Sequence, residues 1–296
     1  MKDRNPLVSI IVVTYNSAKY VLETLESAKA QTYPNIELIV SDDGSQDNTI
    51  KLCKEWLRQN EKRFIYCELI SVEKNTGTPA NCNRGVLASS GKWIKIIAGD
   101  DILHNDAISS LLNFAIVSKN KFVVSDVTFF NEKGIIEKDI NSREIHHFFF
   151  KEKVKDKYKS FLRYSVFLLA PTFFYAREVY DKNGGFDEEC KLVEDRSFIL
   201  KTLGNGINIE FLNKKTVKYR VFYSEMSPEK KRLLDNDQII CNNKYVLPVL
   251  KKGNIKDSVF FAVIYCLNYA KKRSDGNITF LEKLVSKIYH HIRFFS

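Results

Sequence analysis

The chain has 296 residues, about twice the usual length of one domain, so it can bury a substantial hydrophobic core. With 44% hydrophobic and 28% charged residues, its composition is globular and excludes a low-complexity or disordered chain. The formal net charge is +10, and residues 228–296 carry +7 of it, as 13 Lys and Arg against 6 Asp and Glu. Such a basic tail is typical of proteins with a polyanionic neighbour, nucleic acid or an anionic membrane, and equally of a solvated Lys-rich surface.

Neither the cysteines nor the apolar runs indicate an exported or membrane-spanning protein. The six cysteines are spread singly, without a Cys-x-x-Cys pair or a histidine cluster, which predicts reduced thiols and no zinc site. The apolar stretch that ends at Tyr15 lacks a small-residue cleavage site and is interpreted as a buried strand. The longest later apolar run, residues 259–270, is too short to span a bilayer. We therefore expect a cytoplasmic protein.

From residue 7 to residue 130, short β-branched runs alternate with segments of helical periodicity. Strands separated by helices of about ten residues predict an α/β fold with a doubly wound, mainly parallel sheet flanked by helices. The expected strands are 7–14, 36–40, 64–72, 93–98 and 122–127, and the expected helices are 20–30, 48–59, 79–89 and 107–118.

The regular alternation stops after Phe130. Residues 132–159 are rich in charge and aromatics with weak periodicity, so we expect irregular structure that covers the site. A helix that ends at Leu203 and strands at 207–212 and 216–221 close the core, and residues 228–296 form a basic helical C-terminal extension. Its segment 280–295 is amphipathic, which suits either an interfacial membrane anchor or a helix packed on the core.

Polar groups follow three of the predicted strands. They are Thr14-Tyr15-Asn16, residues 41–45 with the pair Asp42-Asp43, and residues 98–101 with the pair Asp100-Asp101. Ligands of doubly wound sheets bind outside the carboxyl ends of the strands. The pattern therefore predicts one site at this edge of the sheet.

Each acidic pair has a functional and a structural interpretation. Asp100 and Asp101 would repel each other unless a divalent cation joins them, and two carboxylates with a diphosphate suit magnesium or manganese; they could equally cap a helix. The pair Asp42-Asp43 could form a turn or accept hydrogen bonds from a base or ribose. Taken alone, the pair Glu194-Asp195 is best explained by its favourable position at a helix start.

Four blocks of sequence stand out, Val8–Asn16, Glu37–Ser45, Asn75–Gly85 and Gly91–Asp101. In this order and spacing they resemble family 2 glycosyltransferases of the GT-A fold. The match continues more thinly through Gly184–Asp187, Glu194-Asp195 and Tyr219-Arg220, so that about residues 5–225 are covered. The resemblance implies a catalytic domain of residues 1–227, with a nucleotide-binding half at about 5–130 and an acceptor half at about 131–227.

The resemblance also implies roles for single residues. Val13, Thr14 and Tyr15 would line the nucleotide pocket, Asp43 would bind the base, usually uracil, and Asn83 falls on an asparagine of the donor site. Asp100 and Asp101 take the place of the metal and ribose carboxylates, and Asp195 takes that of the catalytic base. The implied reaction is an inverting transfer of one hexose or N-acetylhexosamine from a UDP-sugar, with Mn²⁺ or Mg²⁺, to a saccharide acceptor.

The chain departs from the family pattern at three places. Ala98-Gly99-Asp100-Asp101 stands where many members read Asp-x-Asp-Asp, so one contact to the metal or ribose is missing. Cys82 occupies a position that is often Arg, with Arg84 two residues further on. Phe222 stands where a His near the metal often follows Tyr-Arg. Weak metal affinity is expected.

Other function classes fit less well. A nicotinamide-dependent oxidoreductase needs a glycine fingerprint after the first strand, where this chain has Thr14–Ser17, and the sequence contains no P-loop. A processive synthase would carry Gln-x-x-Arg-Trp and membrane-spanning segments, which favours a single-addition transferase. The alternative is a non-catalytic nucleotide- or polyanion-binding protein that uses the basic tail, although no zinc finger or RNP motif supports nucleic acid as the partner.

The resemblance implies a setting in bacterial surface-polysaccharide assembly, such as O-antigen or capsule, with a lipid-linked acceptor. The expected partners are a nucleotide-sugar donor, a glycan or lipid-linked acceptor and, through residues 228–296, the anionic inner face of the cell membrane. No nucleic-acid partner is expected.

Overall fold

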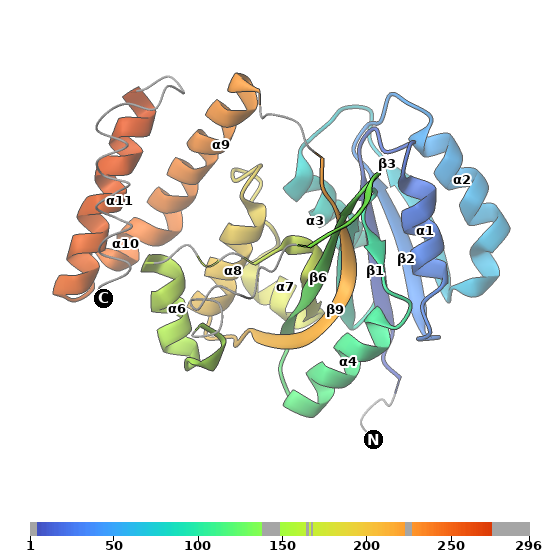
Figure 1. Ribbon diagram of the computed structural model, residues 1–296, viewed down its shortest axis with the longest axis horizontal. Coiled ribbons are helices and arrows are strands. Elements are labelled where there is room, and N and C mark those ends of the chain that lie inside the picture. The colour runs from blue at the N-terminus through green and yellow to red at the C-terminus, as the bar shows by residue number, and fades with distance from the viewer. Residues whose placement is uncertain (1–4, 138–148, 164–165, 167, 223–226, 274–296) are drawn as a thin grey trace.

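The computed structural model describes residues 5–137, 149–163, 166, 168–222 and 227–273. Within them, nine strands form one sheet in the order β3-β2-β1-β4-β8-β6-β9-β5, with β7 paired to β6 (Figure 1). The strands are β1 Val8–Thr14, β2 Ile36–Asp42, β3 Tyr66–Ser71, β4 Trp93–Ala98, β5 Ile102–Leu103, β6 Phe122–Asn131, β7 Gly134–Ile136, β8 Phe174–Ala176 and β9 Glu210–Arg220. The helices are α1 Val21–Lys29, α2 Thr49–Asn60, α3 Thr78–Ala88, α4 Ala107–Ser118, α6 Val154–Arg163, α7 Arg177–Asn183, α8 Glu194–Gly204, α9 Pro228–Cys241, α10 Leu247–Leu250 and α11 Ile255–Arg273.

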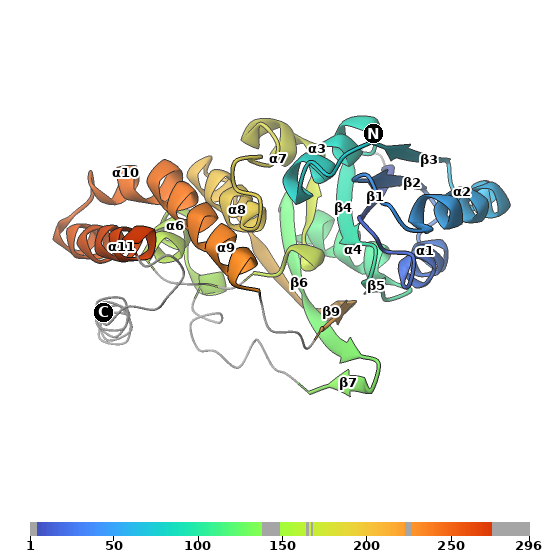
Figure 2. The same cartoon turned by 90° about the horizontal axis from the view of Figure 1, so that it is seen from above.

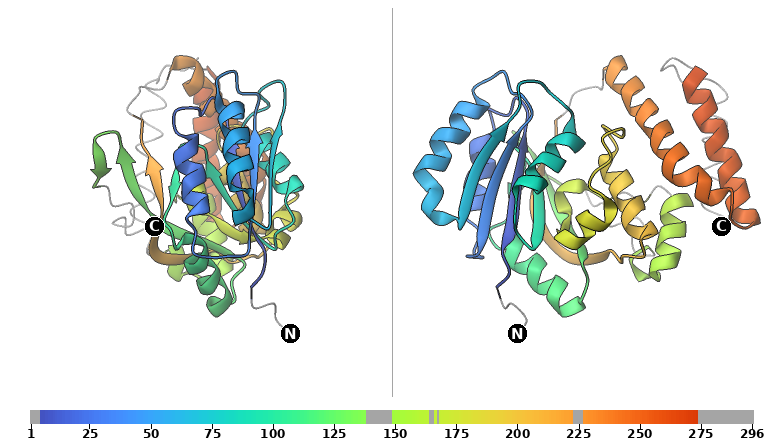
Figure 3. Two further views of the ribbon diagram at one scale, coloured as in Figure 1. Left: turned by 90° about the vertical axis from the view of Figure 1, so that its right-hand side faces the viewer. Right: turned by 180° about the vertical axis from the view of Figure 1, so that it is seen from behind.

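Strands β1, β2 and β4 are buried on both faces of the sheet, whereas the edge strand β3 is only partly buried. Strands β1, β2, β3 and β4 pair in parallel, and every residue of β2 is buried. Helix α1 lies in front of the sheet in Figure 1, and α3 lies in front in the reverse view of Figure 3. Helix α3 approaches β1 closely at Gly85, where a Cβ atom would lie 2.4 Å from Ile11 Cγ2. A near-continuous β-branched run therefore forms a core strand, as expected for a doubly wound sheet.

The predicted doubly wound, mainly parallel sheet is confirmed, with two changes beyond Phe130. The short strand β8 is antiparallel to both β4 and β6, which interrupts the parallel order. The two strands expected at 207–212 and 216–221 form the single strand β9, which pairs with β6 through register shifts next to Asp126. These shifts bend the strand and let it continue to Arg220.

The expectation of irregular structure over residues 132–159 is wrong for the described part of that segment. Strand β7 pairs with the end of β6 in a hairpin, visible as a projecting arm in Figure 2, and helix α6 begins at Val154. Charged residues interrupt the hairpin, so its sequence shows no strand periodicity. The many lysines of α6 likewise obscure its helical periodicity, although Phe161 and Leu162 are buried. Residues 138–148 lie outside the described part.

The described part of the C-terminal extension, residues 228–273, is mostly helical, as expected. Helices α9 and α11 run side by side beside α6 and α8 (Figures 1 and 2). No helix in the described residues is both long and apolar enough to cross a membrane. The amphipathic segment predicted at 280–295 lies outside the described residues. All six cysteines are free thiols.

Candidate active site

The carboxyl ends of β1, β2 and β4 border one cavity of about 530 Å³. The sheet order brings these three strand ends together, because β1 pairs with both β2 and β4. Five predicted site residues are among its walls. Its lining residues are Val13, Thr14, Tyr15, Ser17, Asp43, Asn75, Thr76, Gly77, Thr78, Asn81, Ala98, Gly99, Asp100, Lys191, Leu192 and Leu233.

Asp42 and Asp43 have different roles: Asp42 forms the predicted turn, and Asp43 lines the cavity. Asp42 is structural: its Oδ1 accepts hydrogen bonds from the N–H groups of Gly44 (3.1 Å) and Ser45 (2.8 Å), and Thr14 Oγ1 donates to its Oδ2 at 2.7 Å. Gly44 has a φ of +80°, which favours glycine, so the turn depends on it. Asp43 points to the cavity instead.

Asp43 is only 2% exposed as a residue, and its carboxylate accepts four hydrogen bonds. The N–H groups of Thr76 (3.0 Å) and Gly77 (2.8 Å) donate to Oδ2, while Thr76 Oγ1 (2.6 Å) and Arg84 Nη2 (2.8 Å) donate to Oδ1. Burial raises the pKa of this carboxyl, but the four donors outweigh it, and the net pKa is lowered. Asp43 is therefore a fixed carboxylate at the cavity wall.

Asp100 and Asp101 do not cap a helix. Helix α4 begins only at Ala107, and its N-cap residue is Asp106. The acidic pair is bound instead by Arg220 at the end of β9, whose N–H donates to Asp101 Oδ1 at 2.8 Å and whose Nε donates to the Asp100 carbonyl at 2.9 Å. The helix-cap interpretation is excluded for this pair.

The environment of Asp101 suits a cation. Its side chain is 1% exposed, and its Oδ2 atom is buried without a hydrogen-bond partner. Burial and the nearby charge of Asp100 raise the pKa of Asp101 to about 8, and burial also raises the pKa of Asp100. The described residues contain no group of three or more His, Cys, Asp or Glu side chains that could by themselves hold a metal ion. A divalent ion would therefore need a diphosphate and water to complete its ligands, as magnesium commonly does.

Asp195 is the second residue of the neighbouring helix α8, in a separate segment from the other carboxylates. Burial raises its pKa, and burial together with the Asp195 charge raises that of Glu194. Burial is the main cause that raises the pKa of the Tyr219 phenol. The negative charges of Asp101, Asp100 and Asp195 raise it further. These three carboxylates thus act electrostatically on the same phenol, although Asp195 does not line the nucleotide-side cavity.

The C-terminal extension holds the loop before Asp195. Asp237 of α9 accepts a hydrogen bond from the Leu192 N–H at 2.7 Å. Lys244 Nζ lies 2.8 Å from Asp187 Oδ2, and Tyr245 also donates to Asp187. The sequence carried no signal for these contacts, because each joins residues about 45 to 60 positions apart.

Residues 9–182, more than half of the chain, match the family model described as Glycosyl transferase family 2. The chain belongs to this family. Among curated relatives, it is 34% identical over 105 residues to glycosyltransferase GlyG of Streptococcus pneumoniae, covering 36% of this chain and 34% of GlyG. It is 27% identical over 262 residues to the uncharacterized glycosyltransferase MJ1057 of Methanocaldococcus jannaschii, covering 81% and 83%. It is 26% identical over 216 residues to the minor teichoic acid biosynthesis protein GgaB of Bacillus subtilis, covering 72% of this chain but 23% of GgaB.

Two solved structures share the fold of this family 2 chain. One is S. aureus TarS residues 1–349 in complex with UDP-GlcNAc, with a TM-score of 0.58, 17% identity and coverage of 96% of this chain and 91% of that one. The other is mannosyltransferase PcManGT from Pyrobaculum calidifontis in complex with GDP-Man and Mn²⁺, with a TM-score of 0.61, 15% identity and coverage of 99% and 84%. At these identities the likeness establishes the fold alone.

The structure explains two departures of this family 2 chain from the family pattern. Cys82 is buried, and burial raises the pKa of its thiol, so it faces the core. Arg84, two residues on, reaches the Asp43 carboxylate instead. Phe222, in the position that is often His, is 52% exposed and offers no metal ligand.

Asn83 is not among the cavity's lining residues. Its amide nitrogen donates to the Phe186 carbonyl (3.1 Å) and to Glu188 (2.9 Å). Its amide oxygen accepts from the Phe186 N–H (2.8 Å) and from the Tyr180 hydroxyl (3.0 Å). The side chain therefore joins α3 to the loop that leads toward Asp195.

Proposed function

We propose that this protein is an inverting glycosyltransferase that moves one hexose or N-acetylhexosamine from a UDP-sugar to a saccharide acceptor. The observation that carries the proposal is the arrangement of three acidic groups. Asp43 and Asp100 line one cavity, and Asp195 lies in the first turn of helix α8, in a separate segment. Displacement with inversion requires groups that bind the sugar donor and a separate base that deprotonates the acceptor hydroxyl.

The nucleotide would bind in the cavity of about 530 Å³, between Tyr15 and the 75–78 loop. Asp43 would accept a hydrogen bond from the base, in exchange for one of its present donors. The Thr76 hydroxyl is the donor most easily exchanged, because it can rotate away while the two backbone N–H groups stay in place.

Asp195 would remove the proton from the acceptor hydroxyl. Its raised pKa suits this role, because a base is most effective when its pKa approaches the working pH. The attack would come from the face of the donor sugar opposite the departing diphosphate, which inverts the anomeric carbon.

Asp101 and Asp100 would hold a divalent cation together with the diphosphate, with the partnerless Asp101 Oδ2 as one ligand. Manganese or magnesium bound there would offset the negative charge that develops on the leaving UDP. Arg220 would keep both residues in place through its two hydrogen bonds.

The names of GgaB and of the TarS complex support a UDP-sugar donor and a role in bacterial surface-polysaccharide biosynthesis. We propose a cytoplasmic enzyme whose acceptor is a glycan or a lipid-linked saccharide. The basic residues of 228–296 would bring it to the anionic inner face of the membrane. Sedimentation with phosphatidylglycerol vesicles at low and high salt tests this contact, which is refuted if the protein stays in the supernatant at low salt.

The test of the reaction is UDP release from a panel of UDP-hexoses and UDP-N-acetylhexosamines, with and without manganese, supplemented by acceptor glycosides. Wild type is compared with Asp101→Ala and Asp195→Asn. We expect metal-dependent release from one donor, lost in both variants, while UDP binding survives in Asp195→Asn. Unchanged turnover in Asp195→Asn would refute the base assignment. Absence of UDP binding in a folded wild type would refute the donor assignment.

A further inference from the structure

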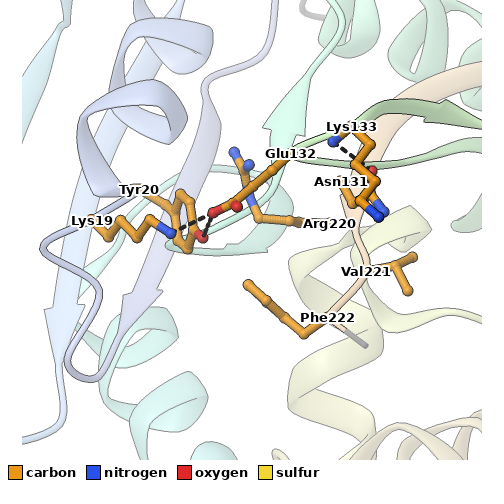
Figure 4. A pocket seen from close by; sticks show the side chains of 8 residues that line it. All are labelled: Lys19, Tyr20, Asn131, Glu132, Lys133, Arg220, Val221 and Phe222. Carbon is orange, nitrogen blue, oxygen red and sulfur yellow. Dashed lines mark hydrogen bonds and ion pairs between the residues drawn. The ribbon is translucent and has the colours of Figure 1, made fainter. Parts of the chain in front are cut away.

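A second cavity, of about 520 Å³, lies between the start of α1, the β6–β7 turn and the end of β9 (Figure 4). It shares no lining residue with the nucleotide-side cavity. Arg220 nevertheless connects the two, because it lines the second cavity and donates to the Asp100 carbonyl at 2.9 Å. A ligand in the second cavity would therefore lie next to the proposed reaction centre.

Aromatic rings form one wall of this cavity. Phe222 is 52% exposed, and its ring centroid lies 5.8 Å from that of Tyr20. Arg220 fixes the Tyr20 ring, since its guanidinium carbon lies 4.1 Å from the ring centroid. An exposed phenylalanine beside a held tyrosine offers an apolar surface on which the C–H face of a sugar ring can pack.

Three basic residues, Lys19, Lys133 and Arg220, and one acidic residue, Glu132, line the rest of this cavity (Figure 4). Arg220 is also ion-paired with Glu23 of α1 at 2.8 Å. Lys19 forms an ion pair with Glu132, but both side chains are 68% exposed, so the pair is weak and can be exchanged. Lys133 makes no ion pair within the described residues. Asn131 uses its Oδ1 atom to accept the Lys133 N–H, which leaves its amide N–H₂ able to donate to a ligand.

We infer that this cavity is an acceptor subsite for a sugar unit that carries an anionic group. The ring packs on Phe222 and Tyr20, and Lys133 pairs with the negative charge, assisted by Asn131. The inference rests on the proposed glycosyl transfer, and it identifies Phe222 and Lys133 as residues that determine acceptor specificity. Because Phe222 stands where other family members often have His, this wall distinguishes the present chain.

The experiment compares two probes that differ in one group, methyl β-D-glucuronide and methyl β-D-glucoside. Binding is titrated by ligand-observed NMR to the full chain in saturating UDP, which blocks the nucleotide-side cavity. We expect the glucuronide to bind about threefold more tightly at low salt, as an exposed charge pair allows. Lys133→Ala should abolish this difference, and Phe222→Ala should weaken both probes by about threefold to tenfold.

Two matched controls keep the test specific. Ile135→Ala removes an apolar side chain that is 73% exposed on β7 but does not line the cavity, and Lys54→Ala removes an exposed lysine from α2. Neither should change the affinity of either probe. The inference is overturned if neither glycoside binds, if both bind equally, or if their binding is unchanged in Phe222→Ala.

UDP binding and UDP-sugar hydrolysis are measured separately on the same samples. If UDP fails to bind while the glucuronide binds and responds to both variants, the proposed donor is wrong and the subsite stands. If UDP binds and the glycosides do not, the subsite is wrong and the donor assignment stands.

Discussion

Arg84 Nη2 lies 2.8 Å from Asp43 Oδ1 and joins helix α3 to the end of strand β2. The Asp43 side chain is 3% exposed and that of Arg84 is 23% exposed, so solvent screens the pair only in part. The same Arg84 nitrogen also donates to Asn81 Oδ1 at 3.1 Å. Arg84 therefore fixes the carboxylate that we assign to the nucleotide base.

Replacing Arg84 tests this assignment. Arg84→Ala leaves a buried carboxylate without its cation, so we expect a loss of about 2 kcal/mol in the free energy of unfolding. UDP affinity should fall by about tenfold, or 1.4 kcal/mol. Arg84→Lys should recover part of both, because lysine restores the charge but not the fork of donors. Urea denaturation and calorimetric titration with UDP measure the two effects, with Arg58→Ala on the exposed face of α2 as control. Unchanged UDP affinity in folded Arg84→Ala would contradict the assignment.

The sequence alone was enough to predict which residues at the ends of the parallel strands lie at the cavity. Thr14, Asp43 and Asp100 each follow a β-branched run, and sheet topology alone requires such strand ends to meet. The family resemblance then supplied expected roles that local pattern could not. Periodicity and turn residues, which act over short distances, thus located one side of the site.

Long-range contacts could not be predicted. The role of Arg84 depends on how α3 crosses β2, and the network around Asn83 depends on a loop about 100 residues away. The antiparallel insertion of β8 between β4 and β6 has only two paired positions on each side, too few to leave a periodic pattern. Tertiary packing decides these features, and one sequence does not encode them in any local signal.

Arg220 is predicted to support both the acidic pair and the second cavity. It is 6% exposed, and its guanidinium carbon lies 4.1 Å from the Tyr20 centroid and 4.4 Å from the Phe130 centroid. Arg220→Lys keeps the charge but loses the planar stacking and the Nε hydrogen bond to Asp100. We expect it to cost about 2 kcal/mol of unfolding free energy and to raise the manganese concentration needed for half-maximal turnover. Lys214→Ala, on the exposed side of the same strand, is the control. An unchanged metal requirement would show that Arg220 does not position the acidic pair.

The proposed boundary at residue 228 predicts that the extension is required for activity. Cys241, Val246, Leu250 and Phe260 of the extension are buried, and Asp237 holds the Leu192 N–H. A chain of residues 1–227 would expose the surface that these side chains cover, so it should unfold at a lower temperature and aggregate. In the full chain, Asp237→Asn should lower kcat more than UDP affinity, because it loosens the loop that leads to Asp195. Thermal unfolding and steady-state kinetics provide the measurements. If residues 1–227 are as stable and active as the full chain, the extension is an independent module.

Glu37 gives the protein a pH-dependent stability that does not involve the active site. Its side chain is 1% exposed and accepts hydrogen bonds from the Ser90 N–H (2.6 Å), the Ser90 hydroxyl (2.8 Å) and the Gly91 N–H (2.7 Å), which join β2 to the start of β4. Burial raises the pKa of Glu37, but the Ser9 hydroxyl, which donates to Oε1 at 2.5 Å, and the Ser90 and Gly91 donors outweigh it, and the net pKa is lowered.

A carboxyl whose pKa is lower in the folded state binds fewer protons there than in the unfolded state. Its stabilisation is therefore complete above the unfolded pKa of about 4.3 and is lost as the pH falls through the folded pKa. Glu37→Gln should cost about 2 kcal/mol at pH 7, since an amide accepts at one oxygen only, and the difference from wild type should shrink below about pH 4. Urea denaturation of both proteins from pH 7 to pH 3 measures it, with the exposed Glu55→Gln on α2 as control. If this difference in the free energy of unfolding stays constant from pH 7 to pH 3, the ionisation of Glu37 does not contribute to stability.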